Sequence, residues 1–409
     1  MMRRKYLISV LALAINVAFA NERCEIKNIK SFYEFLNKQG PSLNLANKRR
    51  DQFTSEIELA KQRPNPEVDL DYLKGDQFGL DLNTATLSIK HTIEFGSKRQ
   101  KRISKATVYS GLNNTQTDLS LYEANVDAAI TYQRIAQLQI LTNSVKEASE
   151  TFDKLVKKLA SRKQLNPEET VSLSTLRLAS NEYKAQLNEI ENERLLLLGK
   201  IAFLTNCKSP KVSYYRFSFP NFSHNQEKKS NTGLLQMEDL KVNLAIEELE
   251  IQKSLGYSNI QLGPVVEYEN QGRDEFVSVG IAITFDLPIL QTNTGGKLKA
   301  LKELEAQTME STNNKKILQI ERENLSKKYN RSLLTYKNMP TLQDLERKHI
   351  EVEKLFSRGL VSISMTIESH RQQVDFLNSL FDMENDLLMT YKNINLIDGD
   401  LHSFNTLLN

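Results

Sequence analysis

Two periodicities of hydrophobic and polar positions alternate along the chain. In residues 277–285 every second position carries a large apolar side chain, and the positions between them are small or polar. This alternation predicts a β-strand whose two faces meet different environments. Between Lys98 and about Leu159, apolar residues recur instead at intervals of three and four, without proline and with Gly111 as the only glycine. That pattern predicts one long amphipathic helix.

The same order of elements occurs twice. In the first half, a helical pattern broken at Gly40-Pro41 precedes strand-like runs at 67–72 and 78–93 and then two long helices, 98–159 and 167–204. In the second half, a helix at 237–255 precedes strands at 259–269 and 276–285, a helix from 297 to a break at Arg358-Gly359, and a last helix at 363–397. A repeat on this scale decides the architecture.

The first twenty residues have the composition of a secretory signal. Arg3, Arg4 and Lys5 precede an apolar run, and Ala18-Phe19-Ala20 has the pattern of a cleavage site. Removing this segment leaves 51 Lys+Arg and 51 Asp+Glu, so the remaining chain is neutral and gives no indication of nucleic-acid binding. No later stretch approaches ~20 continuous apolar residues, so we expect any membrane crossing to use strands.

The predicted organisation follows from the repeat and the signal segment. It consists of a signal peptide (1–20), a first repeat (21–205) with a strand pair at about 66–95 and a helical hairpin at about 98–205, a connector (206–232), and a second repeat (233–409) with a strand pair at about 259–290 and a helical hairpin at about 297–400.

Four strands cannot close a barrel alone, and open strand edges are not tolerated in lipid. Three chains of four strands would give about 12, an even number that suits a membrane barrel with a lumen. A 60-residue helix at ~1.5 Å per residue is roughly 90 Å long, far more than the thickness of a bilayer. If these strands lie in a membrane, we therefore predict a mainly α fold: long antiparallel helical hairpins that form a tunnel, and four membrane strands per protomer that complete a trimeric 12-strand β-barrel.

The chain contains little that suggests bond chemistry. Its five histidines form no H-x₃-H pair, and no phosphate loop, nucleophile elbow or catalytic triad spacing is present. We therefore expect no enzyme, no cofactor and no dedicated metal site, with His370 at a surface or an interface. Cys24 and Cys207 are the only cysteines, and in an oxidising compartment we expect that they can form a disulfide. The residues before Cys24 are not the small apolar ones that lipidation requires.

Four motifs resemble those of the TolC-like outer-membrane efflux protein family, and most closely those of its heavy-metal (CzcC-like) branch. They are Arg63-Pro64-Asn65-Pro66-Glu67, Glu94-Phe95-Gly96-Ser97-Lys98-Arg99 with Arg102, Leu287-Pro288-Ile289-Leu290 with Asn293 and Gly295, and Phe356-Ser357-Arg358-Gly359. The last motif resembles the aromatic-x-x-Gly pattern of the family's helix-tip turns. Lys163 stands where the other tip turn would carry a glycine, which suggests that the two turns are not equivalent.

The resemblance implies an outer-membrane homotrimer whose α-helical tunnel projects into the periplasm. Its helix tips would dock a periplasmic adaptor (membrane fusion) protein that connects to an inner-membrane pump, for which the resistance-nodulation-division type is one candidate class. The protein would be a passive conduit for small solutes or metal cations, as in metal resistance. Two alternatives remain open from the sequence: an outer-membrane conduit for type I protein secretion, and a periplasmic coiled-coil adaptor or scaffold.

Two groups of residues are the candidate sites. The tip group, expected to meet the adaptor and line the tunnel end, consists of Arg162, Lys163, Gln164, Leu165, Asn166 and Pro167 in one turn and Arg358, Gly359, Leu360, Val361 and Ser362 in the other. The junction group, expected to turn the strands into the helices, consists of Gly96, Lys98, Pro288, Asn293, Gly295 and Gly296.

Overall fold

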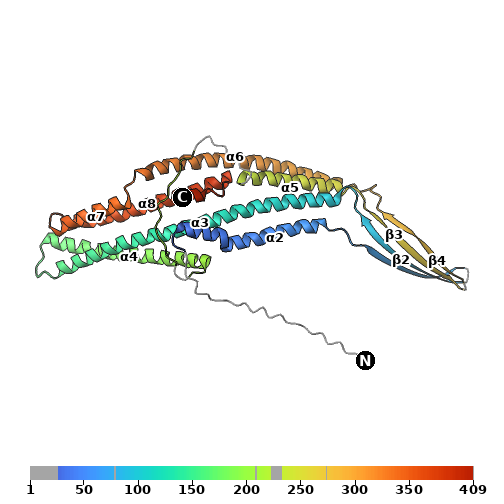
Figure 1. Cartoon of the computed structure of the whole chain (residues 1–409), viewed down its shortest axis with the longest axis horizontal. Coiled ribbons are helices and arrows are strands. Elements are labelled where there is room, and N and C mark those ends of the chain that lie inside the picture. Colours follow the sequence, from blue (N-terminus) through green and yellow to red (C-terminus); the bar gives the residue numbers. More distant parts are fainter. Residues whose placement is uncertain (1–25, 78–79, 208–209, 223–232, 273, 409) are drawn as a thin grey trace, which may run out of the picture.

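The computed structural model describes residues 26–77, 80–207, 210–222, 233–272 and 274–408. The molecule is elongated, with a β-sheet at one end and the tips of long helices at the other (Figure 1). The helices are α1 (Ile29–Gln39), α2 (Pro41–Lys61), α3 (Lys98–Ala160), α4 (Pro167–Thr205), α5 (Leu234–Ser254), α6 (Thr294–Asn338), α7 (Leu342–Ser357), α8 (Ile363–Asp398) and the short α9 (Phe404–Leu407). The strands are β1 (Glu67–Gln77), β2 (Leu80–Ile93), β3 (Ile260–Gln271) and β4 (Asp274–Phe285).

The four strands form one antiparallel sheet in the order β1-β2-β3-β4. The central pairing joins the two halves of the chain, because β2 belongs to the first half and β3 to the second. In the register, Leu70 lies opposite Leu87, Leu87 opposite Val266, and Val266 opposite Val279. Residues that lie opposite one another across a ladder share a face of the sheet. The apolar positions of all four strands therefore form one continuous face.

This apolar face is open to solvent in the single chain. Val279 is 77% exposed and Leu70 is 72% exposed, which a soluble domain would normally avoid for so large a patch. The opposite face carries polar and charged residues, including Asp69, Thr86, Glu267 and Ser278. Within the part of the chain that the structure describes, β1 and β4 each pair along one edge only.

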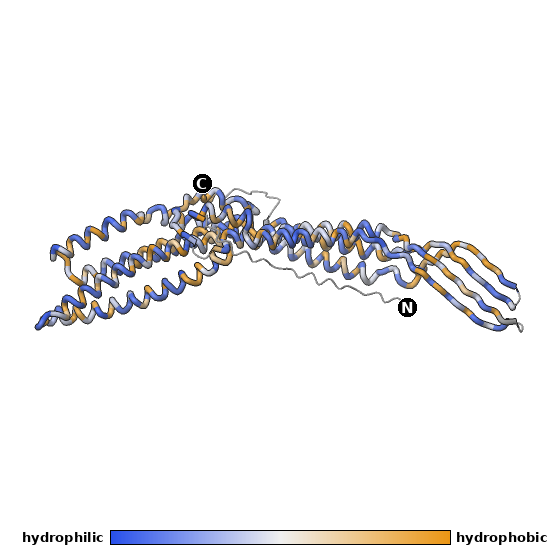
Figure 2. The backbone as a smooth tube through the Cα atoms, turned by 60° about the horizontal axis from the view of Figure 1, so that its bottom comes forward, coloured by the Kyte–Doolittle hydropathy of each residue, from blue (hydrophilic) through white to orange (hydrophobic). Residues whose placement is uncertain are grey.

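The helical part is built around α3, which packs against α2, α4, α5 and α8. Its main core lies where α3 meets α1, α4, α6, α8 and α9, and it contains buried side chains such as Phe32, Tyr132, Tyr329 and Phe381. Figure 2 shows hydrophobic and hydrophilic positions interspersed along the helices. Among the described residues, no helix has both the length and the apolar character to cross a membrane.

The predicted connector is more than a linker. Its described part, residues 210–222, packs into the main core, where Phe217 is 4% and Phe219 is 6% exposed. The segment is also hydrogen-bonded in its middle and at its end: the Gln133 amide donates to the Tyr215 carbonyl at 2.6 Å, and the Asn330 amide donates to the Phe222 carbonyl at 2.8 Å. This segment therefore ties α3 of the first half to α6 of the second.

The second half differs from the prediction in one element. The sequence interpretation placed a single helix from Lys297 to Arg358, whereas α6 ends at Asn338 and α7 starts at Leu342. Pro340 explains the break, because proline has no N–H and disfavours helical backbone in the preceding residue. Met339 accordingly has extended angles (φ −71°, ψ 143°). Thr341 then restarts the helix through a reciprocal capping box with Asp344.

Candidate functional site

The two tip turns lie at the same end of the molecule, opposite the sheet (Figure 1). One joins α3 to α4 and the other joins α7 to α8. Both are anchored on a second hydrophobic cluster, which contains the buried side chains of Phe152, Leu176 and Val374. Leu165 of the first turn and Ile363, just after the second, pack against this cluster. The fold therefore brings the two predicted tip segments to one end of the helical body.

The α3–α4 turn is held by a capping box. Asn166 Oδ1 accepts from the Glu169 N–H at 2.7 Å, and Glu169 Oε2 accepts from the Asn166 N–H at 3.0 Å. Arg162 forms an ion pair with the same glutamate. Pro167 occupies the first helical position, where its missing N–H costs nothing. Arg162, Lys163 and Gln164 remain exposed, and no residue of this turn has a positive φ.

The α7–α8 turn has a different backbone. Gly359 has a φ of +73°, a left-handed conformation that glycine adopts without a steric penalty. The Gly359 N–H donates to the Phe356 carbonyl at 2.9 Å, and the Leu360 N–H donates to the Leu355 carbonyl at 3.0 Å. These two bonds form a Schellman motif. Arg358 and Leu360 are exposed, the latter at 69%, while Val361 is half-buried and Ser362 caps α8.

The two turns are therefore not equivalent, as the lysine at position 163 suggested. Together they present three cations, Arg162, Lys163 and Arg358, next to exposed apolar side chains such as Leu360 and Met365. A solvent-exposed surface of this mixed character can bind another protein chain.

The first strand–helix junction is densely packed. Gly96 has a φ of +71°, and a Cβ at this position would lie 2.5 Å from a ring atom of Tyr257. Lys98 is buried, and its Nζ donates to Asn259 Oδ1 at 2.6 Å; burial lowers the pKa of this amine. Arg102 pairs with Glu94, and this hydrogen bond holds the pKa of the carboxyl below its usual range.

The second junction follows the same plan with different residues. Asn293 has a left-handed backbone (φ 55°), and its side-chain amide donates to the Gln252 carbonyl at 2.8 Å. Gly296 approaches this amide so closely that a Cβ would lie 2.3 Å from Asn293 Oδ1. Pro288 is exposed, and Gly295 has open space around it. Four of the six predicted junction residues are thus packed in the junctions, and these two are not.

The predicted disulfide involves one cysteine that lies outside the described residues. Cys207 is buried at 6% exposure just after α4. Cys24 lies outside the described residues, and no cysteine within them is free. The Cys24–Cys207 pairing, like the signal peptide at 1–20, stays a prediction.

Sequence reasoning missed a buried carboxyl group in the main core. Glu384 of α8 is 0% exposed. It accepts hydrogen bonds from Gln137 Nε2 at 2.7 Å, Gln133 Nε2 at 3.3 Å, and the hydroxyls of Tyr214 and Tyr336 at 3.2 Å each. Burial raises the pKa of Glu384 above the usual range of a carboxyl, against the opposing effect of these four donors. The group links α3, α6, α8 and the connector.

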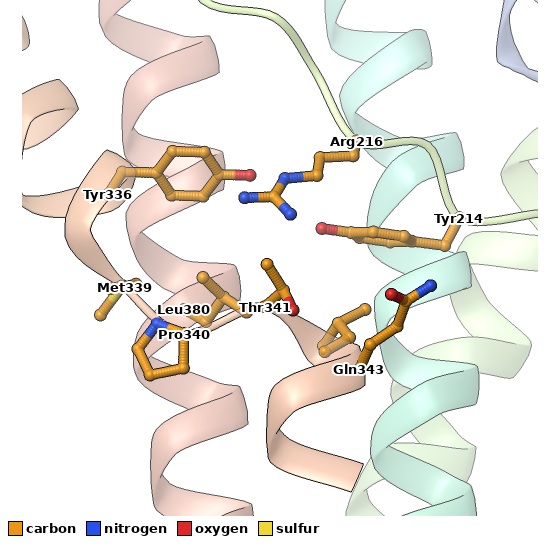
Figure 3. Close-up of a pocket in the computed structure, with 9 residues that line it drawn as sticks. Tyr214, Arg216, Tyr336, Met339, Pro340, Thr341, Gln343 and Leu380 are labelled. Carbon is orange, nitrogen blue, oxygen red and sulfur yellow. The ribbon is translucent and has the colours of Figure 1, made fainter. Parts of the chain in front are cut away.

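A cavity of about 310 Å³ adjoins this network at the break between α6 and α7. Figure 3 shows the guanidinium of Arg216 between the hydroxyl ends of Tyr214 and Tyr336, with Pro340 and Thr341 below. The described residues that line the cavity include no histidine, cysteine or carboxylate.

Two histidines that belong to no local metal-binding motif in the sequence contact each other between α7 and α8. The ring centroids of His349 and His370 are 4.8 Å apart, and Glu353 Oε1 lies 3.8 Å from His370 Nε2. His370 is 2% exposed, so the expectation that it lies at a surface or an interface is wrong for the single chain. Of the described residues, these three form the only group whose ligand atoms could hold a metal ion.

Comparisons with known proteins identify the class of fold. No protein-family model matches the chain, and no curated protein matches it. Solved structures do match: the outer membrane channel CmeC of Campylobacter jejuni has 12% identity and a TM-score of 0.68 over 91% of this chain and 86% of its own. The outer membrane protein VceC of Vibrio cholerae has 14% identity and a TM-score of 0.63 over 91% and 96%. The open state of the Neisseria gonorrhoeae MtrE outer membrane channel has 11% identity and a TM-score of 0.64 over 90% and 90%.

The chain therefore has the fold of outer-membrane channels. This likeness spans nearly the whole described chain and most of each matching structure. It confirms, at the level of fold, the resemblance to the TolC-like family that the sequence motifs indicated. The heavy-metal branch is not distinguished by these comparisons.

Proposed function

We propose that the chain is the outer-membrane channel-tunnel of a tripartite efflux system. In this role it is a passive conduit: an inner-membrane pump supplies the energy, and a periplasmic adaptor connects the two proteins. The cargo consists of small solutes or metal cations. The observation that carries the proposal is the sheet, whose apolar face is exposed and continuous across all four strands.

The sheet has the dimensions and chemistry of a membrane wall. Its strands contain 11 to 14 residues, enough to cross a bilayer when tilted, which takes about 9–11 residues. The apolar face suits lipid, and the polar face suits a water-filled lumen. The unpaired edges of β1 and β4 require partner strands in lipid. Two further copies of the chain supply these partners in a homotrimer with 12 strands.

The helical body then extends into the periplasm. At ~1.5 Å per residue the 63 residues of α3 span roughly 95 Å, and its far end carries the tip turns. The charged and apolar tip surface is the part of the tunnel farthest from the membrane. An adaptor protein in the periplasm can therefore reach the tunnel at this surface. This placement supports the docking role predicted for the tip group.

The proposal is tested by membrane fractionation of cells that produce the full chain, followed by size analysis of the protein purified in detergent. We expect an outer-membrane protein with the mass of three chains. A soluble periplasmic monomer would instead indicate the adaptor or scaffold alternative. Deleting the gene and exposing cells to metals, drugs and detergents separates the cargo classes. Loss of an exported protein, with unchanged resistance, would favour type I secretion.

A further inference from the structure

His349 and His370 lie on neighbouring helices near the tip end of the molecule. His349 belongs to α7 and is 7% exposed, whereas His370 belongs to α8 and is 2% exposed. The ring of Phe152, from α3, contacts the His370 ring edge-on with centroids 5.4 Å apart. The two imidazoles are therefore held between three helices rather than exposed on a flexible loop.

Each ring has a buried nitrogen without a hydrogen-bond partner among the described residues. These atoms are His349 Nδ1 and His370 Nε2. A buried polar atom without a partner destabilises the fold, so native structures normally satisfy it with protein, water or an ion.

Two carboxylates border the rings. Glu353 Oε1 lies 3.8 Å from His370 Nε2, and Glu147 Oε1 of α3 lies 3.3 Å from His349 Nε2. One ligand atom each from His349, Glu353 and His370 lie within 4.8 Å of one another. Ligands of a tetrahedral ion at ~2.0–2.1 Å lie about 3.4 Å apart, so the side chains need to close by only about 1.5 Å.

We propose that His349, His370 and Glu353 form a binding site for a divalent transition-metal cation of the Zn²⁺ class, with Glu147 in contact with the outer nitrogen of His349, Nε2. Two imidazoles and carboxylates are the donors that Zn²⁺ accepts in tetrahedral sites. The two carboxylates balance the charge of the ion. A cavity of about 360 Å³, which His349 and Glu147 help to line, gives the ion a route from solvent.

The bound ion would tie α7 to α8, and the contact of Glu147 with His349 would connect this pair to α3. His349 and Glu353 are one turn apart on α7, His370 is on α8, and Glu147 is on α3. Since α7 is a separate helix with breaks on both sides, the ion would fix it against α8 just behind the tip turns. The site does not depend on the proposed channel function, because its ligands lie within one chain.

The test is equilibrium dialysis of Zn²⁺ against the full chain, purified in detergent without a histidine tag and stripped with EDTA. We expect one Zn²⁺ per chain, and a Co²⁺ derivative with the visible absorption of a tetrahedral site. Glu353→Gln and His370→Gln should each weaken binding at least about 100-fold, because losing even outer-shell partners costs 10- to 100-fold. Glu351→Gln, an exposed residue on the same helix, makes the same charge change and should bind as the wild type does.

Several outcomes would overturn the site. Absence of stoichiometric binding by the wild type excludes it outright. Equal loss in Glu351→Gln and Glu353→Gln would indicate general attraction to an acidic surface. Unchanged binding in both His370→Gln and Glu353→Gln would place the ion elsewhere. Glu353 is partly exposed, so its variant should fold even if His370→Gln does not, and circular dichroism checks this point.

Discussion

Glu384 is the residue at which burial and hydrogen bonding oppose each other most directly. It has no exposed surface, yet four donors converge on it. Burial of an ionised carboxylate is costly unless hydrogen bonds compensate. The raised pKa of Glu384 indicates that desolvation is the larger effect. The pKa of each neighbouring tyrosine, Tyr214 and Tyr336, is raised as well, first by burial and then by the carboxyl charge.

This balance predicts a pH dependence. A group whose folded-state pKa is raised contributes its full stability below its unfolded pKa, about 4.3 for Glu, and loses that contribution as pH rises through the folded pKa. The neutral variant Glu384→Gln should therefore gain in stability relative to the wild type as the pH rises from about 4.5 to 7.5. Thermal unfolding in detergent at both pH values measures the difference.

Asp382→Asn is the matched control for this prediction, because Asp382 is exposed on the same helix. It should leave the pH dependence of the wild type unchanged. If Glu384→Gln unfolds with the same pH dependence as the wild type, the carboxyl group is not the titrating group that we infer.

At the residue scale, only some of the residues of the candidate sites could be predicted from the sequence. Asn166 and Pro167 could be read as a helix start because their chemistry is local. Glu384 had a readable signal, since it lies at helical spacing among the apolar residues Phe381, Leu387 and Leu388. The contact between His349 and His370 had no such signal in the sequence, because it depends on how α7 packs on α8. Their separation of 21 positions matches no local metal motif.

At the scale of elements, proline, glycine and capping residues determine where the helices begin and end. The α1–α2 boundary at Gly40-Pro41 lies where the pattern predicts. The α6–α7 break was missed although Pro340 was present, because the apolar spacing of the two helices runs on across it. That break matters, since it makes α7 a short independent helix that ends in a tip turn.

The tip turns give the second prediction. The double variant Arg358→Glu with Gly359→Asp reverses an exposed charge and places a side chain at a left-handed position, which costs about 1–2 kcal/mol. We expect loss of export, measured as loss of resistance in a deletion strain, with unchanged trimer size in detergent. The local strain is small compared with the packing of the helical body, so assembly should persist.

Lys299→Glu is the control for the tip variant. This lysine is exposed and lies near the start of α6, at the opposite end of the helical body. It should retain normal resistance. Normal resistance in the tip variant would contradict docking at these turns, and a variant that fails to form trimers would point to a structural role instead.

At the scale of the whole molecule, the sheet needs two different environments, because one of its faces is apolar and the other is polar. The number of its strands could be predicted from the repeat. The pairing of β2 with β3 could not, because it joins residues that lie 167 to 189 positions apart in the sequence, from Ile93 with Ile260 to Leu82 with Gln271. Under the proposed function, strands of other copies would close the sheet at the outer edges of β1 and β4, and the sequence of one chain does not show this closure.

The two faces of the sheet give the third prediction. Val279→Lys places a charge on the apolar face near the middle of β4, which costs about 2–4 kcal/mol at the centre of a bilayer. Ser278→Lys, one residue earlier, places the same charge on the polar face. We expect Val279→Lys to reduce the amount of trimer in the outer membrane and Ser278→Lys to leave it unchanged. Equal amounts of both variants would contradict the assignment of the faces.

The pairing of β2 with β3 also has a consequence for biogenesis. The ribosome makes the first half of the chain before the second, so the β1–β2 hairpin exists for a time without its partner. During that interval its apolar face and the free edge of β2 are open to other chains, which is a recognised route to aggregation. A chaperone that holds the unfolded chain would therefore be needed most while residues 260–271 are still missing. Misfolding should increase when translation pauses between the two halves.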